Sequence, residues 1–396
     1  MNFLAEWKNN TEYFELLKLM ARLSNLFSDS EIPFLHYRIT ENLFCKYFKA
    51  ENLSRSDTAY DAKKDSFGIG IKTFTLTNGH STEKVAEFNS ISSTLKQYKG
   101  ADLAYQIAKA RNERMQLGQR LYAIQNGCYH IVGRVPGGLT VFNDDYPLIN
   151  LNKITAVKDT GKSIQFCDDK NSYTYNFSKS TLFKEFYVAK DNVHIPVSII
   201  QDPYEILKKL IEAQNYDGKY DDIHEVHKVI QKKIQSQKQL ILGVNYVILP
   251  LFSTTTKNVP ERSGLNQWNA NGRPRDADEV YIPIPARINK NFPHFFTERD
   301  VSFTLHLPNG SSILAKPCQQ NRKALMSNPN TDLGKWILRD VLQLKQGELA
   351  TMELLNRMGF DSVIIYKNSD RDYRIDVCRT LSYSDEMYEE YGEEDD

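Results

Sequence analysis

The stretch FGIGIKTF, residues 67 to 74, decides the fold of the N-terminal part. Side chains alternate along a strand, so Gly68, Gly70 and Lys72 share one face of it. Glycine weakens a strand and usually marks a bulge or a place where something approaches the backbone closely. We therefore expect an object to lie against this glycine face, with the lysine side chain directed at it.

A polar segment, TAYDAKKDSFG, leads into this strand and predicts a hairpin. If its loop leaves Asp61 opposite Gly70, then Asp61 and Lys72 share a sheet face, and the glycines leave room for a metal and a phosphodiester. A tight turn at Lys64 and Asp65 would instead place Lys72 too far along its strand. The alternative interpretation is a solvated turn residue and an ordinary strand lysine.

The residue types at this hairpin suit metal-dependent phosphodiester hydrolysis. One or two carboxylates hold Mg²⁺, which keeps several of its waters. The metal neutralises the developing charge and lowers the pKa of the attacking water. A lysine beside it orients that water and the scissile phosphate. On this hypothesis Asp61 is a metal ligand and Lys72 a catalytic residue.

The hairpin resembles the PD-(D/E)xK nuclease superfamily, which includes most type II restriction endonucleases. Asp61 matches the first acid of that family, and Lys72 matches its lysine. The sequence departs from the pattern at Gly70, where the second acid is expected. Several family members carry that carboxylate on the following helix, so the resemblance implies an α/β (α+β) nuclease domain with a displaced acid.

The displaced acid is expected in TEKVAEFN, within a helix predicted over residues 82 to 97. This segment offers Glu83 and Glu87, and we choose Glu87 as the second catalytic acid and metal ligand. Glu41, on a helix that begins near Arg38, could supply a further carboxylate. The resemblance thus implies Mg²⁺ as the cofactor.

The chain divides into an α/β N-terminal part and a β-rich C-terminal part. Short alternating strands with turn signals such as NDDYP and KDTGK begin at about residue 120. The expected organisation is a nuclease domain over 1–200, a helical linker over 201–239, a β-rich DNA-recognition pseudobarrel over 240–382 and an acidic disordered tail over 383–396.

Two polar loops of the C-terminal part suit contacts with DNA bases. Guanidinium groups bind guanine bidentately in the major groove, and planar amides bind adenine. In the first loop the candidates are Gln267, Asn269, Asn271, Arg273 and Arg275. In the second, between two predicted strands, they are Lys367, Asn368, Ser369, Asp370, Arg371 and Tyr373. For either loop alone, an ordinary exposed turn is the alternative.

The succession DEVYIPIP, GKWILRDVL and MGFDSVIIYK…YRIDV resembles the DNA-recognition domain of certain restriction endonucleases. That domain is a seven-stranded pseudobarrel related to the plant B-three transcription-factor domain, and two arms of it clasp the major groove. The resemblance implies that the first loop is the N-terminal arm and the second loop the C-terminal arm. It spans more than a third of the chain.

Composition sets limits on the class of protein. The 396 residues carry 50 basic and 50 acidic side chains. Eight of the acids lie in the last stretch, SDEMYEEYGEEDD, so the rest of the chain is positive by eight, which is compatible with DNA binding. The five cysteines are scattered without CxxC spacing, which argues against zinc and a disulfide framework and indicates a reducing cytoplasm. No apolar run approaches the ~20 residues of a membrane span.

These observations together predict a cytoplasmic, Mg²⁺-dependent, sequence-specific endonuclease of the type II restriction kind. Its partners are double-stranded DNA, a second copy of the chain on DNA in a possible homodimer, and a cognate DNA methyltransferase; no membrane partner is expected. Two rivals stay open. One is a nuclease that requires a modified base or a second effector site, and the other is a non-catalytic DNA-binding regulator.

Overall fold

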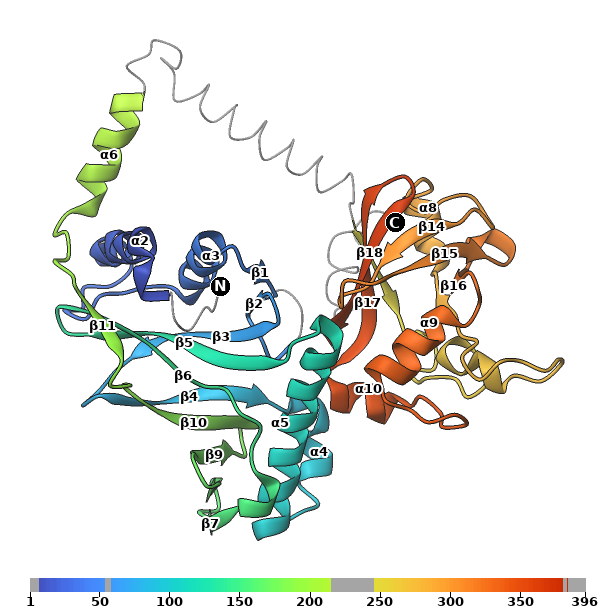
Figure 1. The fold of residues 1–396 in the computed structure, drawn as a ribbon, viewed down its shortest axis with the longest axis horizontal. Coiled ribbons are helices and arrows are strands. Elements are labelled where there is room, and N and C mark those ends of the chain that lie inside the picture. Colours follow the sequence, from blue (N-terminus) through green and yellow to red (C-terminus); the bar gives the residue numbers. More distant parts are fainter. Residues whose placement is uncertain (1–6, 54–57, 215–245, 380–382, 384–396) are drawn as a thin grey trace, which may run out of the picture.

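The N-terminal unit contains two β-sheets that face each other (Figure 1). The structure is a computed structural model, and it describes residues 7–53, 58–214, 246–379 and 383. The first sheet has the order β1-β2-β3-β5-β6-β11, and only β3 and β5 run parallel. Its strands are β1 (Glu51–Asn52), β2 (Ala62–Lys64), β3 (Phe67–Thr75), β5 (Asn126–Val135), β6 (Gly138–Asp145) and β11 (Asn192–Pro196).

The second sheet is antiparallel throughout, with the order β4-β10-β9-β8-β7. Its strands are β4 (His80–Glu87), β10 (Thr181–Tyr187), β9 (Ser172–Asn176), β8 (Ser163–Cys167) and β7 (Thr155–Asp159). The helices of this unit are η1 (Trp7–Asn9), α2 (Thr11–Arg22), η2 (Ser24–Leu26), α3 (Tyr37–Phe48), η3 (Asn89–Ile91), α4 (Ser92–Leu95), α5 (Gly100–Tyr122), η4 (Leu151–Lys153) and α6 (Pro203–Gln214).

Helices α2 and α3 cover the outer face of the first sheet (Figure 1). Apolar residues at helical spacing bury one face of α2, and the Asn10 side chain caps its start by accepting from the backbone N–H of Tyr13. Buried Tyr13 and Phe44 pack with Ile69 and Val132 of the sheet. The opposite face of the sheet, which carries the glycines, is turned towards β10 and α5.

The segment after β3 is a strand where a helix was predicted. Residues 80–87 form β4, which pairs with β10 from His80 to Glu87, and only the short α4 falls within the predicted helix 82–97. The register shifts once, between Leu182 and Phe183. Pairing with β10 stabilises the extended backbone, because sheet preference depends on cross-strand neighbours more than on local propensity. The prediction of a helix carrying Glu83 and Glu87 is therefore wrong.

The C-terminal unit is a seven-stranded, nearly closed sheet with the order β12-β17-β18-β14-β15-β16-β13. Its strands are β12 (Tyr246–Pro250), β13 (Ile282–Pro283), β14 (Phe303–His306), β15 (Ser312–Cys318), β16 (Ala324–Ser327), β17 (Phe360–Ser369) and β18 (Asp372–Arg379). Its helices are η6 (Gly264–Asn269), α8 (Ala286–Asn291), η7 (Gln320–Arg322), α9 (Asp332–Gly334), η8 (Lys335–Val341) and α10 (Met352–Met358). The predicted pseudobarrel is confirmed.

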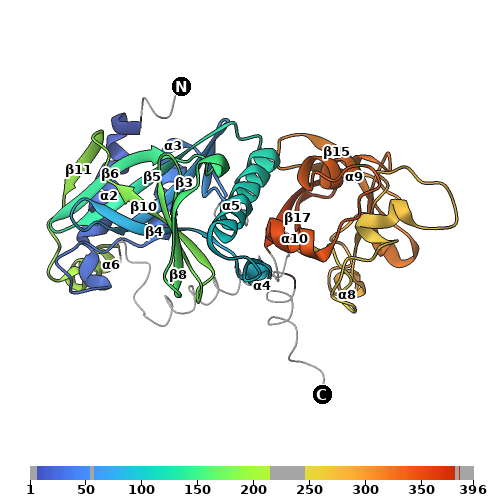
Figure 2. The same ribbon diagram turned by 90° about the horizontal axis from the view of Figure 1, so that it is seen from below.

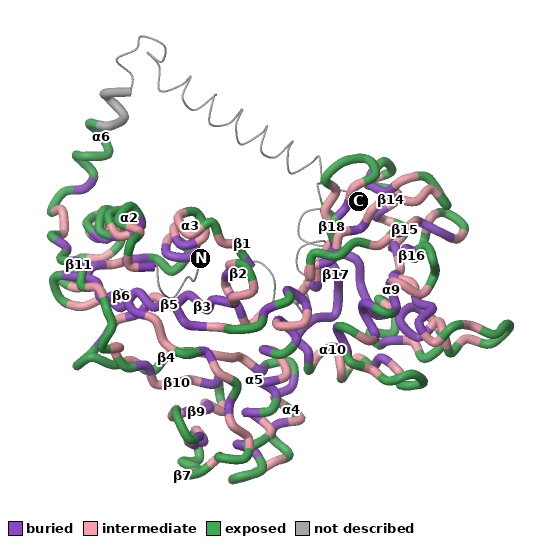
Figure 3. Tube along the Cα trace, in the orientation of Figure 1, coloured by how far each residue is buried: buried purple, intermediate pink, exposed green. Residues whose placement is uncertain are grey.

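Helix α5 lies between the two units, as Figure 2 also shows. The Arg120 guanidinium donates to the carbonyl oxygens of Asp340 and Val341, both at 3.0 Å. The Tyr122 hydroxyl donates to the carboxylate of Asp376 at 2.9 Å. A continuous apolar core joins the glycine side of the first sheet to the barrel interior, which is seen as buried chain on both sides of α5 in Figure 3. The N-terminal unit and the barrel are thus packed together through this helix.

Two predicted segments fall largely outside the described residues. Of the linker expected over 201–239, the structure describes α6 up to Gln214, and the remainder lies outside. The acidic tail expected over 383–396 lies outside except for Tyr383, which packs into the barrel core. Within the described residues, no helix has both the length and the apolar character needed to cross a membrane.

Candidate active site and nucleic-acid interface

The hairpin β2–β3 places Asp61 beside Gly70. The pairing runs from Lys64 with Phe67 to Ala62 with Ile69, around a two-residue turn, so Asp61 follows at the position opposite Gly70. The Asp61 carboxylate Oδ2 accepts from the backbone N–H of Ile71 at 2.7 Å. The carboxylate thus replaces a backbone acceptor of the ladder at the residue just before β2 begins. The hairpin register therefore meets the condition stated from the sequence, that Asp61 lies opposite Gly70.

The glycine face of β3 is covered by tyrosine rings of the same chain. A Cβ atom at Gly68 would lie 2.5 Å from Tyr60 Cδ1, and one at Gly70 would lie 2.8 Å from Tyr129 Cδ1 and 2.9 Å from Tyr146 Cε1. Any side chain at these positions would therefore clash with the rings. The expectation that the glycines leave room for a metal and a phosphodiester is wrong, because these rings occupy the space.

Lys72 faces a carboxylate of the second sheet. Glu83 of β4 is the cross-strand partner of Lys184, which is buried. Burial raises the pKa of Glu83, while the Ser81 hydroxyl, which donates to its carboxylate at 2.5 Å, and the charges of Lys72 and Arg134 oppose that rise. A half-buried acid held near a lysine is typical of functional sites. Glu83, the acid that sequence reasoning ranked second, is thus the one that the structure sets near Lys72.

Glu41 and Asp61 approach a common neighbour, the Cys45 thiol. Burial raises the pKa of this thiol to about 11, and the negative charges of Glu41 and Asp61 raise it further. Glu41 is buried on α3 and accepts from the Arg38 guanidinium at 2.9 Å. Two of the predicted acids therefore lie close enough to the same side chain to act on it together.

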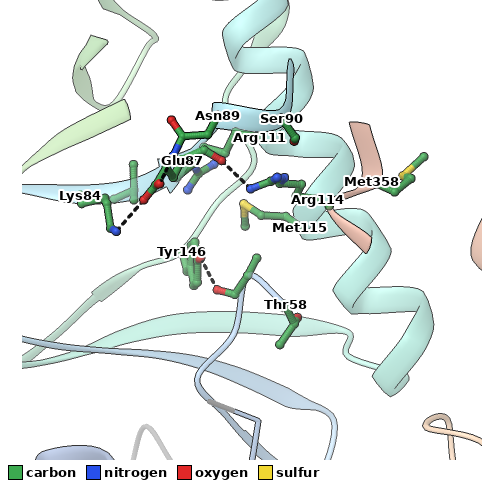
Figure 4. A pocket seen from close by; sticks show the side chains of 14 residues that line it. Thr58, Lys84, Glu87, Asn89, Ser90, Arg111, Arg114, Met115, Tyr146 and Met358 are labelled. Carbon is green, nitrogen blue, oxygen red and sulfur yellow. Dashed lines mark hydrogen bonds and ion pairs between the residues drawn. The ribbon is translucent and has the colours of Figure 1, made fainter. Parts of the chain in front are cut away.

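Glu87 lies in a different environment, at the end of β4 (Figure 4). Its carboxylate accepts from the Lys84 ammonium at 3.0 Å and from the side-chain amide of Asn89. It lines a cavity of about 600 Å³ to which Asp61 does not contribute. The structure does not bring the predicted metal pair, Asp61 and Glu87, to one cavity.

The described residues contain no group of three or more His, Cys, Asp or Glu side chains that could hold a metal ion. Mg²⁺ is often held by only one or two carboxylates together with substrate phosphates. Asp61 with Glu41 is the acid pair that fits this smaller requirement.

In the barrel, the first predicted arm is folded back on itself. The Arg275 guanidinium donates to the carbonyl oxygens of Ala270 at 2.6 Å and Asn271 at 3.1 Å. Arg273 pairs with the buried carboxylate of Glu279. The guanidinium groups of both arginines are thus bound by groups of the same loop and the residues that follow it. Of the other candidates in this arm, Asn269 donates to the carbonyl oxygen of Glu261, Gln267 is half-buried, and Asn271 is exposed.

The second predicted arm is the turn between β17 and β18. Asn368, Ser369, Asp370 and Arg371 are exposed there, and Lys367 pairs with Asp370 at 3.0 Å.

Tyr373 does not belong to this surface. It is fully buried in the barrel core, and its hydroxyl donates to the Phe295 carbonyl oxygen at 2.6 Å. Its side chain points inward together with those of Ile375 and Val377. The assignment of Tyr373 to DNA contact is therefore wrong.

Three basic residues beside the second arm, Lys290, Arg322 and Lys323, were not among the predicted contacts. Lys367 donates to the carbonyl oxygen of His294, and the Arg322 guanidinium donates to that of Pro293. Exposed Lys290 and Lys323 lie on the same neighbouring segments, α8 and the end of η7. The signal in the sequence was the pair of short basic stretches RINKNFPH and QQNRK.

Comparison with known proteins identifies the nature of the barrel. Residues 244–369 match the family model of the NgoFVII C-terminal B3-like DNA-binding domain. A search of curated proteins found no match. The match covers the seven-stranded sheet up to the end of β17, and the N-terminal unit lies outside it. Over these residues the C-terminal unit is therefore similar to a B3-like DNA-binding domain.

Proposed function

We propose that the protein is a sequence-specific DNA endonuclease of the restriction type, in which the barrel binds DNA and the N-terminal unit hydrolyses it. The family match of the barrel is the observation that carries the proposal. In the same chain, the N-terminal unit holds half-buried Lys72 near the carboxylate of Glu83. Exposed Arg371 and half-buried Lys367 are the proposed contacts of the second arm with DNA.

In the proposed site, Lys72 orients the attacking water and the scissile phosphate. Bound Mg²⁺ would lower the pKa of that water and offset the charge that develops on the phosphate. Asp61 and Glu41 are the residues that would hold the ion. Glu83 lies near this lysine, and its raised pKa suits proton exchange with water. Glu87 stays a predicted ligand, although it is engaged by Lys84 and Asn89.

Cleavage of both strands needs two active sites or two sequential nicks. We propose a homodimer on DNA or sequential nicking by one copy. A cognate methyltransferase protects the host sites in such a system, and both proteins act in the cytoplasm.

The test is a digest of unmethylated phage DNA by the purified protein with Mg²⁺ and, in parallel, with EDTA. Discrete fragments that appear only with Mg²⁺ are expected, and sequencing of their ends gives the recognition site. Intact DNA that is nevertheless shifted in mobility would overturn the proposal as stated. A digest of methylated DNA then separates a modification-dependent nuclease, which cuts it, from a non-catalytic regulator, which does not.

A further inference from the structure

A cavity lies where the N-terminal unit meets the barrel (Figure 4). Its wall is made by the end of β4, by α5, by the residues just before β2, and by the end of α10 with the first residue after it. Its volume is about 600 Å³, within the usual range for small-molecule sites. A ligand in it would touch both units at once.

Arg111 of α5 gives this cavity an unbalanced positive charge. The side chain is only 2% exposed, and its guanidinium donates to the Pro147 carbonyl oxygen at 3.0 Å and to the Tyr129 hydroxyl at 3.4 Å. Its Nε atom is buried without a hydrogen-bond partner in the described part of the chain, where no carboxylate pairs with the guanidinium either. Buried charges are normally paired, so Arg111 is an exception that calls for an anion.

A second buried cation, Lys184, lies close enough to feel the charge of Arg111 and has a carboxylate partner of its own. Asp144 accepts from the buried ammonium of Lys184 at 2.6 Å. Burial lowers the pKa of Lys184, the Asp144 carboxylate opposes this, and the Arg111 charge lowers it further. Asp144 is therefore paired with Lys184, and no carboxylate in the described part of the chain forms an ion pair with Arg111.

The rest of the cavity wall adds positive charge and hydrogen-bonding groups. Arg114 donates to the Glu87 carbonyl oxygen at 2.6 Å, and Lys84 pairs with the Glu87 carboxylate. Three cationic side chains thus face one acidic side chain in the wall. The amide of Asn89 and the hydroxyl of Ser90 lie on the same wall (Figure 4).

We propose that this cavity binds a phosphate-bearing ligand of up to mononucleotide size, with its phosphate against Arg111 and Arg114. Guanidinium groups match phosphate oxygens in geometry and charge. The apolar side chains of Met115 and Met358 on the wall suit the remainder of such a ligand. The phosphate belongs either to a free nucleotide or to a nucleotide of bound DNA. The inference does not require the N-terminal unit to be a nuclease.

The test is isothermal titration of the full-length protein in EDTA with inorganic phosphate and with deoxyadenosine monophosphate, at ionic strength held constant with sodium chloride. Arg111→Met removes the buried charge while keeping much of the volume. Arg114→Gln keeps a hydrogen-bond donor and is the second variant, in case the first does not fold. Lys109→Gln changes an exposed charge on the same helix and is the matched control.

Saturable binding is expected in the wild-type protein and in Lys109→Gln, with at least tenfold weaker binding in Arg114→Gln and in folded Arg111→Met. Absence of saturable binding, or equal affinity in Arg114→Gln and the wild type, overturns the proposal. Competition by a short duplex distinguishes the sources: displacement of the nucleotide indicates a phosphate of DNA, and simultaneous binding indicates a free nucleotide. Since EDTA prevents metal-dependent cleavage, these outcomes are independent of the proposed nuclease activity.

Discussion

The two units of the molecule place their charged side chains in different ways. In the barrel, four candidates of the second arm, residues 368–371, lie exposed at the turn, and half-buried Lys367 is held by a backbone carbonyl oxygen and by Asp370. In the N-terminal unit, Glu83, Lys184 and Arg111 are half-buried or buried between layers. Exposed charges add affinity for a polyanion at little cost to the fold, whereas buried charges cost stability unless they are compensated. The difference is consistent with binding in the barrel and chemistry in the N-terminal unit.

The largest expected effect concerns Lys72 of β3, which is half-buried in the N-terminal unit. Lys72→Met should reduce the rate of DNA cleavage by at least about 100-fold, because removal of one preorganised charge from an active site typically costs that much. DNA binding should be unchanged. The measurement is single-turnover cleavage of a defined duplex beside a mobility-shift titration of the same duplex.

Lys64→Met, at the turn of the same hairpin, is the matched control and should cut at the wild-type rate. Equal loss of cleavage in both variants would mean that the hairpin has only a structural role. It would contradict the assignment of cleavage to the N-terminal unit.

The second effect is a pH dependence of stability from the core of the N-terminal unit. Burial lowers the pKa of His130 to about 4, and its ring bonds the Tyr13 hydroxyl at 2.9 Å and the Asn143 side chain at 2.8 Å. Between these two pKa values, His130 is protonated in the unfolded chain, where its pKa is near 6.5, but stays neutral in the folded protein. The free energy of unfolding should therefore fall by about 2 kcal/mol from pH 7 to pH 5 on account of this residue.

Urea unfolding at both pH values checks this effect, and His130→Gln should flatten the dependence while lowering stability at pH 7. An unchanged slope in this variant would show that the histidine is not held neutral in the fold.

The third effect compares the two arms of the barrel. Arg371→Ala should weaken binding of the cognate site by about 1–3 kcal/mol if the guanidinium contacts a base. Arg275→Ala should lower the stability of its loop and change affinity less, because its guanidinium is bound to carbonyl oxygens of the loop.

Mobility shifts at two salt concentrations separate the cases, since loss of a phosphate contact reduces the salt dependence of binding. A larger loss of affinity with Arg275→Ala than with Arg371→Ala would identify the first arm as the principal reader of DNA.

The smallest effect concerns the buried tyrosine of the barrel. Tyr373→Phe should lower the free energy of unfolding by about 0.5–1.5 kcal/mol, through loss of the bond to the Phe295 carbonyl oxygen. Affinity for DNA should stay at the wild-type value. A loss of affinity without a loss of stability would restore Tyr373 to the DNA-contacting surface.

Local patterns in the sequence predicted the hairpin and the β-rich C-terminal part, whereas the hairpin register was only a condition and the barrel came from a family resemblance. The pairing of β2 with β3 places Asp61 beside Gly70, and alternation along β17 and β18 predicts a sheet. The same alternation, applied to β18, would have placed Tyr373 inside with Ile375, and the polar residues around it obscured that signal.

Contacts between the two sheets of the N-terminal unit could not be predicted from one sequence. The approach of Glu83 to Lys72 depends on β4 leaving the first sheet and pairing with β10, about 100 residues later in the chain. The tyrosine rings over Gly70 come from β5 and from the residue after β6, and no local pattern specifies this packing. Glu87 was chosen on a predicted helix face, which the strand β4 replaces.

The central claim, that the barrel binds DNA and the N-terminal unit cuts it, is tested most directly by Asp61→Asn. This variant keeps an oxygen that can accept from the backbone N–H of Ile71 but removes the negative charge. Cleavage and mobility shift are measured on one duplex with Mg²⁺. The account predicts wild-type affinity with cleavage abolished. Cleavage at the wild-type rate by the folded variant would contradict it.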